Sequence, residues 1–218
     1  MADPLLFTEF ANLLPKAQIR FWLESNSETS GLASGNLVVA DMGPAYWMAE
    51  ITAINMGNAD AMQAQALMHR LKGGLRDFYL CDPRCQYPQY DPDGSILGSA
   101  TITNTDVNND GVRMKFSGFP RRYTITPGDM FCFGFGPGNS YRALHQVVVG
   151  GTADNTPTGA TGWIEFWPPL EDPDLSTGKA MDFTKPFGRF KLVPGSYEAG
   201  TAKQMMTTGL SFKAKQVP

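Results

Sequence analysis

The residues best suited to chemistry are few in this chain. It has three cysteines, Cys81, Cys85 and Cys132, and two histidines, His69 and His145. The cysteines and one histidine could form a zinc site with three sulfur ligands and one nitrogen. Structural zinc sites, however, usually use two closely spaced cysteine pairs, and only one pair is present. We therefore interpret the cysteines as reduced, buried thiols, and the sequence assigns them no role beyond packing.

An acidic loop offers oxygen ligands. The run Asp106-Val-Asn108-Asn-Asp110-Gly111 matches the first half of a calcium-binding loop, in which alternate oxygen ligands wrap the ion and a glycine permits the sharp turn. The twelfth position should be a bidentate glutamate, and here it is Ser117. The run is therefore typical of a β-turn whose side chains bond their own backbone, and we expect no metal.

The remaining candidates for catalysis or nucleotide binding are equally weak. The run 134–138 has the glycine content of a phosphate-binding loop, but the segment 141–149 that follows is typical of a strand and not of a helix. Ser140 lacks the second glycine of a nucleophile elbow, and His145 lies in an apolar strand. We expect a glycine-rich hairpin at 134–138, no catalytic or cofactor-binding residue, no cofactor and no enzymatic activity.

Composition favours a folded, mainly β protein. The 218 residues suit one large or two small domains, and 42% hydrophobic with 18% charged residues is enough to build a core. Gly 23 and Pro 16 exceed average usage and predict many short elements joined by turns. The net charge is -3 and the longest basic run is Arg121-Arg122, which argues against a nucleic-acid-binding protein. The first residues contain no export or membrane-spanning pattern, so we expect a cytoplasmic product.

The first 92 residues are predicted to contain strands and one helix. Strands are expected at 18–23, 37–40, 46–54 and 76–81, with a polar loop at 25–35 and a hairpin turn at 42–44. Alternation predicts one buried face in the third of these strands, formed by Trp47, Ala49, Ile51 and Ala53.

The helix is predicted over 59–71. Asn58 or Asp60 can cap its start, and Gly73 can take the left-handed conformation after its end. Apolar residues at three- and four-residue steps predict a stripe packed on a sheet, formed by Ala61, Ala64, Met68 and Leu71.

The middle of the chain is predicted to form a small β-barrel or sandwich. A stretch with prolines at 83, 88 and 92 places a boundary near residue 92. Six β-prone segments follow at 100–103, 111–116, 122–126, 130–135, 141–149 and 162–166. Further strands are expected at 180–183, 187–193 and 205–217.

Three stretches carry a family resemblance. The first combines Trp47-Met-Ala-Glu-Ile, Leu67-Met-His-Arg-Leu71-Lys-Gly73 and Arg76-Asp-Phe78-Tyr-Leu80-Cys-Asp82-Pro83. The second is Ile125-Thr-Pro127-Gly128-Asp129-Met-Phe. The third runs from Thr152-Ala153-Asp154 through Gly159 to Ile164-Glu-Phe-Trp-Pro168-Pro169-Leu170 and Phe187-Gly-Arg-Phe190-Lys-Leu192. In this order, over about residues 45–193, they resemble the distal tail proteins of bacteriophages with long, flexible tails.

The resemblance implies a tail-tube-like β-sandwich from residues 1–92 and 165–218, with one helix packed on it and a small β-barrel at 93–164 inserted. It also implies a structural virion protein of the tail tip, assembled in the host bacterial cytoplasm. Such proteins form a homohexameric ring between the major tail tube protein and the tail-tip hub protein. DNA passes through the bore without sequence-specific binding, and no membrane is involved.

Two alternatives remain open. One is another tail component, either a tube or a tail-completion subunit. The other is a carbohydrate-binding β-sandwich module, for which Trp163, Trp167 and several tyrosines could stack on sugar rings.

Overall fold

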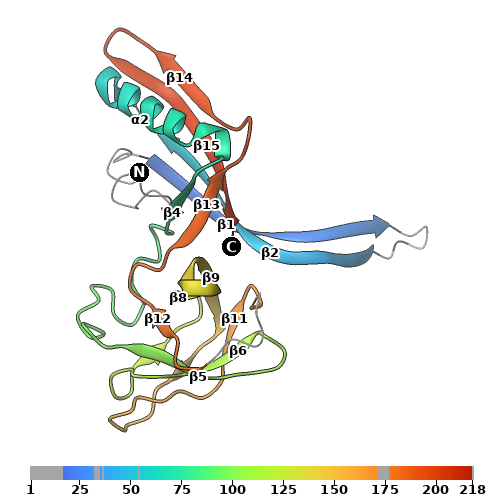
Figure 1. The fold of residues 1–218 in the computed structure, drawn as a ribbon, viewed down its shortest axis with the longest axis vertical. Coiled ribbons are helices and arrows are strands. Elements are labelled where there is room, and N and C mark those ends of the chain that lie inside the picture. The colour runs from blue at the N-terminus through green and yellow to red at the C-terminus, as the bar shows by residue number, and fades with distance from the viewer. Residues whose placement is uncertain (1–16, 32–34, 36, 54, 171–176, 218) are drawn as a thin grey trace. The chain divides into compact units, whose positions relative to one another are not determined.

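The computed structural model describes residues 17–31, 35, 37–53, 55–170 and 177–217 (Figure 1). It divides the chain into two compact units. The sheet unit contains residues up to 80 together with 189–217, and the barrel unit contains residues 81–188. The predicted mainly β fold, with a helix and a closed barrel, is confirmed.

The sheet unit is built on one seven-stranded sheet. Its main path is β1-β2-β15-β13-β4, and β3 and β14 also pair with β15. The strands are β1 (Ala17–Gly31), β2 (Leu37–Ala53), β3 (Met56–Gly57), β4 (Asp77–Leu80), β13 (Gly188–Leu192), β14 (Glu198–Ala202) and β15 (Met206–Val217). Segments from both ends of the chain therefore lie side by side.

One face of this sheet is buried, as the alternation in β2 predicts. Trp47 and Ala53 are 4% exposed, and Ala49 and Ile51 are fully buried. Aromatic rings from other strands complete the core: the Phe190 ring of β13 lies 5.6 Å from that of Phe21. Period-two burial across several strands indicates that hydrophobic packing fixes their register.

Helix α2 (Asn58–Arg70) buries the predicted stripe and ends near the predicted residue. Its N-cap is Gly57, so the predicted capping role of Asn58 or Asp60 is wrong. The Asn58 side chain instead donates to the Lys203 carbonyl at 3.1 Å and accepts from the Thr207 hydroxyl at 2.9 Å. These bonds tie the helix start to the β14–β15 hairpin.

The turn after the helix is a short 3-10 element, η1 (Lys72–Gly74), in which Gly73 has the predicted positive φ, +66°. Gly74 also has a positive φ, +100°, and a Cβ there would lie 2.5 Å from the Leu192 carbonyl oxygen. Only glycine lets the chain pass this close to β13.

Two predictions for the first strands are wrong. The expected loop at 25–35 is strand as far as Gly31, and the expected hairpin turn at 42–44 lies inside the continuous strand β2. Gly43 pairs with Asn26 at a register irregularity between β1 and β2. The glycine and proline therefore mark a bulge in one strand, which bends it without reversing it.

The barrel unit closes six strands in the order β11-β6-β5-β12-β8-β9. They are β5 (Ile102–Val107), β6 (Arg113–Ser117), β8 (Met130–Phe135), β9 (Tyr141–Val149), β11 (Ile164–Trp167) and β12 (Ala180–Asp182). A separate pair is formed by β7 (Thr124–Ile125) and β10 (Gly151–Thr152), and η2 (Pro137–Asn139) links β8 to β9. The glycine-rich segment 134–138 is thus part of a hairpin, as predicted.

Aromatic rings fill the barrel. Phe116, Phe131 and Phe166 are fully buried, and the Phe131 ring lies 5.5 Å from Phe116 and 5.4 Å from Phe166, both edge-on. Edge-to-face rings pack densely and favourably. The barrel therefore has a complete core of its own.

The division at 80/81 and 188/189 differs from the predicted boundaries near 92 and 165. Strands β11 and β12 close the barrel, so the barrel unit extends past residue 165. The proline-rich segment also belongs to the barrel unit, because its backbone and side chains bond to the turn before β8.

Candidate functional site

The feature that most needs a partner is the outer half of the β1–β2 hairpin. We call residues 26–31 of β1 and 37–43 of β2 the β-ribbon. Strand β15 pairs with β2 only from Met48 to Thr52, so within the described residues the β-ribbon has two strands and no third. Figure 1 shows these two strands continuing beyond the rest of their sheet. An isolated two-stranded hairpin is at best marginally stable in water.

The β-ribbon exposes an apolar strand. Leu37 is 67% exposed, Val38 49%, Val39 57% and Met42 61%. Val38 and Val39 point to opposite faces, because side chains alternate along a strand. Both faces of the β-ribbon therefore carry apolar surface, which in soluble proteins marks an interaction site.

The opposing strand supplies small polar residues. Thr29 pairs with Val39, Ser30 with Val38 and Glu28 with Ala40. The backbone of β2 in the β-ribbon faces β1 on one side only, so its other edge can accept a further strand. The β-ribbon thus offers both apolar side chains and open backbone groups to a partner.

A second open edge lies at β14. This strand pairs with β15 from Glu198 to Ala202, and all five of its residues are exposed. Met205 and Met206, which follow it, are 81% and 43% exposed. The sheet unit therefore has two exposed margins built from strands that are distant in sequence.

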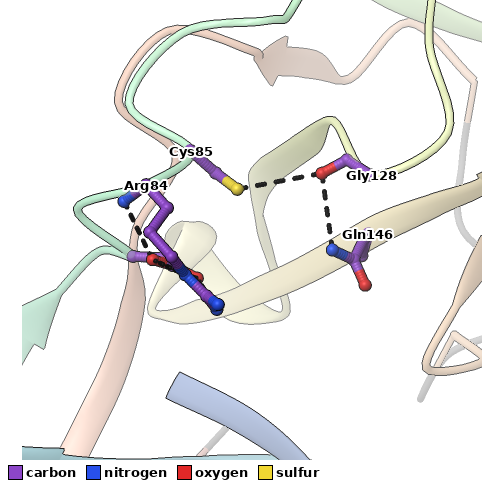
Figure 2. Close-up of polar contacts among 5 residues, drawn as sticks. Arg84, Cys85, Gly128 and Gln146 are labelled. Carbon is purple, nitrogen blue, oxygen red and sulfur yellow. Dashed lines mark hydrogen bonds and ion pairs between the residues drawn. The ribbon is translucent and has the colours of Figure 1, made fainter. Parts of the chain in front are cut away.

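In the barrel unit, by contrast, loop segments are held by hydrogen bonds and an ion pair within the unit. Figure 2 shows the segment after β4 packed on the turn before β8: the Cys85 thiol donates to the Gly128 carbonyl at 3.8 Å, and the Gln146 side chain donates to the same oxygen at 3.4 Å. Arg84 forms an ion pair with the buried Asp82, at 2.7 Å between Nη2 and Oδ2.

Asp129 shows the structural role of the Pro127-Gly128-Asp129 motif. Its carboxylate accepts the backbone N–H groups of Gln89 and Thr126, each at 2.8 Å. Burial raises the pKa of the Asp129 carboxyl, while these two hydrogen bonds lower it. The motif therefore holds the proline-rich segment on the barrel.

The three thiols do not gather into a metal site. Cys132 accepts hydrogen bonds from the Phe187 N–H and from Arg142, and Cys85 bonds to the Gly128 carbonyl. Burial raises the pKa of Cys81 to about 11, so it stays a thiol at neutral pH. No group of three or more potential metal ligands exists among the described residues.

His145 lies inside the barrel, where it faces the core. Its Nδ1 lies 2.8 Å from the Pro168 carbonyl oxygen, and its ring packs against both Phe131 and Phe133. Burial lowers its pKa to about 4, so the imidazole is neutral at pH 7. Its Nε2 is buried without a hydrogen-bond partner, which leaves it no proton path to a substrate.

The acidic loop at 106–111 forms the turn between β5 and β6. Asp110 Oδ1 accepts the Val112 N–H at 3.1 Å, and its Oδ2 accepts from Arg113 Nε at 2.9 Å. Asp106 pairs with Lys115 at 3.0 Å. Both carboxylates are thus engaged by the turn and its neighbouring cations.

A small hollow in the barrel unit has a volume of about 150 Å³ and lies among residues that include Leu97, Ile102, Met181 and Phe183. Its carboxylate, Asp182, pairs with Arg142. Among the lining residues named here, no nucleophilic side chain is in contact with a side chain that could act as its base.

The sequence analysis did not predict the β-ribbon, although the sequence contains an apolar run that indicates one of its strands. The run Leu37-Val-Val-Ala lies opposite residues 28–31, which contain β-compatible Thr29, but the polar character of residues 28–31 favoured a loop. None of the helices in the described ranges is long and apolar enough to cross a membrane.

No protein-family model matches the chain, and no curated protein matches it.

Proposed function

We propose that this protein is a structural subunit of a bacteriophage tail tip, a distal tail protein. In this proposal six copies form a closed ring that joins the tail tube to the tail-tip hub, and DNA passes through its bore. The observation that carries the proposal is the β-ribbon, whose two strands expose apolar side chains and have no third strand paired to them among the described residues.

A second copy is the occupant that this surface suits best. A ring requires each subunit to present two different surfaces, one of which fits the other on its neighbour. The sheet unit has two such margins, the β-ribbon and the β14 edge. Burying Leu37, Val38, Val39 and Met42 against a neighbour would remove their apolar surface from water.

The charge of the chain is compatible with a DNA conduit. A net charge of -3, with no basic run longer than two residues, gives little attraction for phosphates. A bore that does not bind DNA lets it pass. The resemblance of the three sequence stretches is the support for the tail-tip assembly, and the exposed apolar side chains of the β-ribbon support contact with a further chain.

The experiment is native mass spectrometry with negative-stain imaging of the full-length protein, alone and co-expressed with the tube and hub proteins of the same phage. We expect a species of six times 23.8 kDa that images as an annulus. The double variant Leu37→Glu/Val39→Lys should remain folded and lose the annulus. The matched control is Met62→Lys, at an exposed position on α2.

Three outcomes would contradict the proposal. A monomer in every mixture would remove the ring, and an open filament in place of a closed ring would instead support a tube subunit. Unchanged assembly of the β-ribbon variant would show that this surface does not make the contact.

A further inference from the structure

We propose that residues 168–170, which follow β11, form an acid-sensitive strap on the barrel. The neutral imidazole of His145 holds this strap closed, and protonation of His145 releases it. The proposal concerns the barrel unit alone and does not rest on the ring. It is carried by the place of His145 in the aromatic core and by the few backbone donors that the strap has.

The His145 side chain is enclosed by aromatic rings. The residue is 3% exposed and lies opposite Phe131 in the β8–β9 ladder. The centre of its ring is 5.4 Å from that of Phe131, 5.5 Å from Phe133 and 5.0 Å from Phe166. These rings replace water around the imidazole, and burial away from water disfavours a charged group. The site therefore favours the neutral ring.

No charged side chain among the described residues compensates a proton on this imidazole. Cys132 on β8 and Arg142 on β9 lie on the face of these strands that points away from the barrel interior, where Arg142 pairs with Asp182. Glu165 alternates with buried neighbours in β11 and points outward. The Asp129 carboxylate, just before β8, accepts two backbone N–H groups. A protonated imidazole would therefore have no counter-ion.

The contact between His145 and the strap fixes which ring nitrogen carries the proton. Nδ1 lies 2.8 Å from the Pro168 carbonyl oxygen, which can only accept, so Nδ1 donates and Nε2 of the neutral ring has none. Nε2 is buried without a hydrogen-bond partner. Protonation would place a new N–H donor and a positive charge at that atom, and an unpaired buried donor is costly. Water must then reach Nε2, which requires a neighbouring segment to move.

The strap is the neighbour that moves most easily. Pro168 and Pro169 have no backbone N–H, so Leu170 supplies the only backbone donor of the strap, to the Gly111 carbonyl at 2.8 Å. Strands β8 and β9, by contrast, are paired continuously over 130–135 and 141–146. Segments with few hydrogen bonds open at the lowest free energy. Opening would uncover Leu170, which is 8% exposed in the closed strap, and so offer an apolar surface only at acidic pH.

The sign of the pH dependence follows from linkage. In the closed strap burial lowers the pKa of His145 to about 4, and in the open form the imidazole returns towards its ordinary value of 6.5. The open form therefore binds more protons between these values. The closed form is fully favoured above pH 6.5 and loses its advantage as the pH falls towards 4. Between pH 7 and pH 5 the opening equilibrium constant should rise about 20-fold.

The experiment is amide hydrogen–deuterium exchange of the full-length protein at pH 7, 6 and 5, read by mass spectrometry on peptides that cover residues 164–170. Rates are corrected for the intrinsic effect of pH on exchange. The reporters are the amides of Leu170 and of Phe166, which donates to the Val112 carbonyl at 2.9 Å. Peptides from β8 and β9 serve as the internal reference.

The same series is run on His145→Phe, which keeps an aromatic ring that cannot be protonated. A second variant, His145→Leu, fills the same apolar site if the phenylalanine does not fold. The matched control is His69→Phe, which removes the other histidine, at an exposed position on α2. Melting curves confirm that each variant is folded.

We expect the protection of Leu170 to fall about 20-fold between pH 7 and pH 5 in the wild type and in His69→Phe. In the His145 variants it should change by no more than about two-fold over the same range. Phe166 should follow Leu170, and the β8 and β9 amides should lose much less protection.

The proposal is overturned if the wild-type strap keeps its protection at pH 5, or if the loss persists in the folded His145 variants. An equal loss in β8 and β9 would also overturn it, because the whole barrel would then be opening in place of the strap. Failure of the hexameric ring would leave this pH response intact, so the two proposals are separable.

Discussion

The barrel and the β-ribbon are both built from antiparallel strands. They differ in how much of their apolar surface and how many of their strand edges are covered by the rest of the chain. In the barrel six strands close on themselves around fully buried rings such as Phe131 and Phe166. In the β-ribbon two strands carry Leu37, Val38 and Val39 into solvent. A closed barrel removes its sheet edges, whereas a two-stranded ribbon keeps them. The difference teaches that the barrel covers its core within one chain, whereas the β-ribbon leaves apolar side chains that no described residue covers.

The largest expected effect is on the barrel core. Phe131→Ala should lower the free energy of unfolding by about 4 kcal/mol, because it removes a ring that packs on Phe116, Phe166 and Phe183. Urea denaturation of the wild type and variant measures the change. The conservative control Phe131→Leu should cost less. A loss below about 1 kcal/mol would mean that the barrel is not the tightly packed unit described here.

The pH dependence of the barrel comes next. His145 has a pKa of about 4 in the folded state, below its usual 6.5, so the unfolded state binds more protons between these values. Its stabilising contribution is therefore complete above pH 6.5 and is lost as the pH falls towards 4. Between pH 7 and pH 4.5 this one group should cost about 2 to 3 kcal/mol.

The measurement is urea denaturation at both pH values for the wild type and His145→Phe. The phenylalanine keeps an aromatic ring against Phe131 and Phe133 and cannot be protonated. The difference between the two pH profiles isolates His145 from the carboxylates. Parallel profiles would show that the imidazole is not buried in its neutral form.

A smaller effect is expected where the proline-rich segment meets the barrel. Asp129→Ala should cost about 2 kcal/mol, because the backbone N–H groups of Gln89 and Thr126 lose their acceptor. Asp129→Asn keeps one acceptor oxygen and should cost less. Hydrogen exchange should show faster exchange at Gln89 in the alanine variant, and unchanged exchange there would refute the assigned hydrogen bond.

The smallest effect on stability is expected in the β-ribbon. Val39→Thr should change the free energy of unfolding of the monomer by no more than about 0.5 kcal/mol, because the side chain is 57% exposed and buries little surface. Amide exchange in the β-ribbon of the monomer should be much faster than in β8 and β9. In the assembled protein the β-ribbon amides should become protected. Slow exchange in the monomer would mean that the β-ribbon is already complete.

Short sequence patterns predicted those strands and that helix whose structure depends mainly on residues within the element itself. The strands β8 and β9 were predicted at their observed bounds, since both are β-prone runs that lie between glycine-containing turns. The helix stripe and the buried face of β2 followed from their periods in the same way. The division of the chain was harder, because the pairing of β11 and β12 into the barrel depends on strands distant in sequence.

The β-ribbon and the two tryptophans at β11 show what a sequence pattern leaves undetermined. A run of Ser and Thr, such as residues 25–30, is compatible with a loop and with an exposed strand, and only the facing residues 37–41 decide between them. The sequence singled out Trp163 and Trp167, but their outward orientation becomes certain only when Ile164 and Phe166 are seen in the core. Chemistry-bearing residues such as His145 were correctly read as parts of a sheet.

The passage of the chain between its two units has a consequence for its evolution. Gly74 lies against Leu192 and Asp77 pairs with Arg189, so β4 and β13 are adjacent and run in opposite directions. The chain therefore leaves the sheet at Leu80 next to the place where it returns at Arg189. A departure and a return on neighbouring strands, roughly 5 Å apart, can be bridged by a short peptide. Residues 81–188 thus have the geometry of an exchangeable cassette, which selection can replace, enlarge or remove while the strand ladder beneath it stays intact.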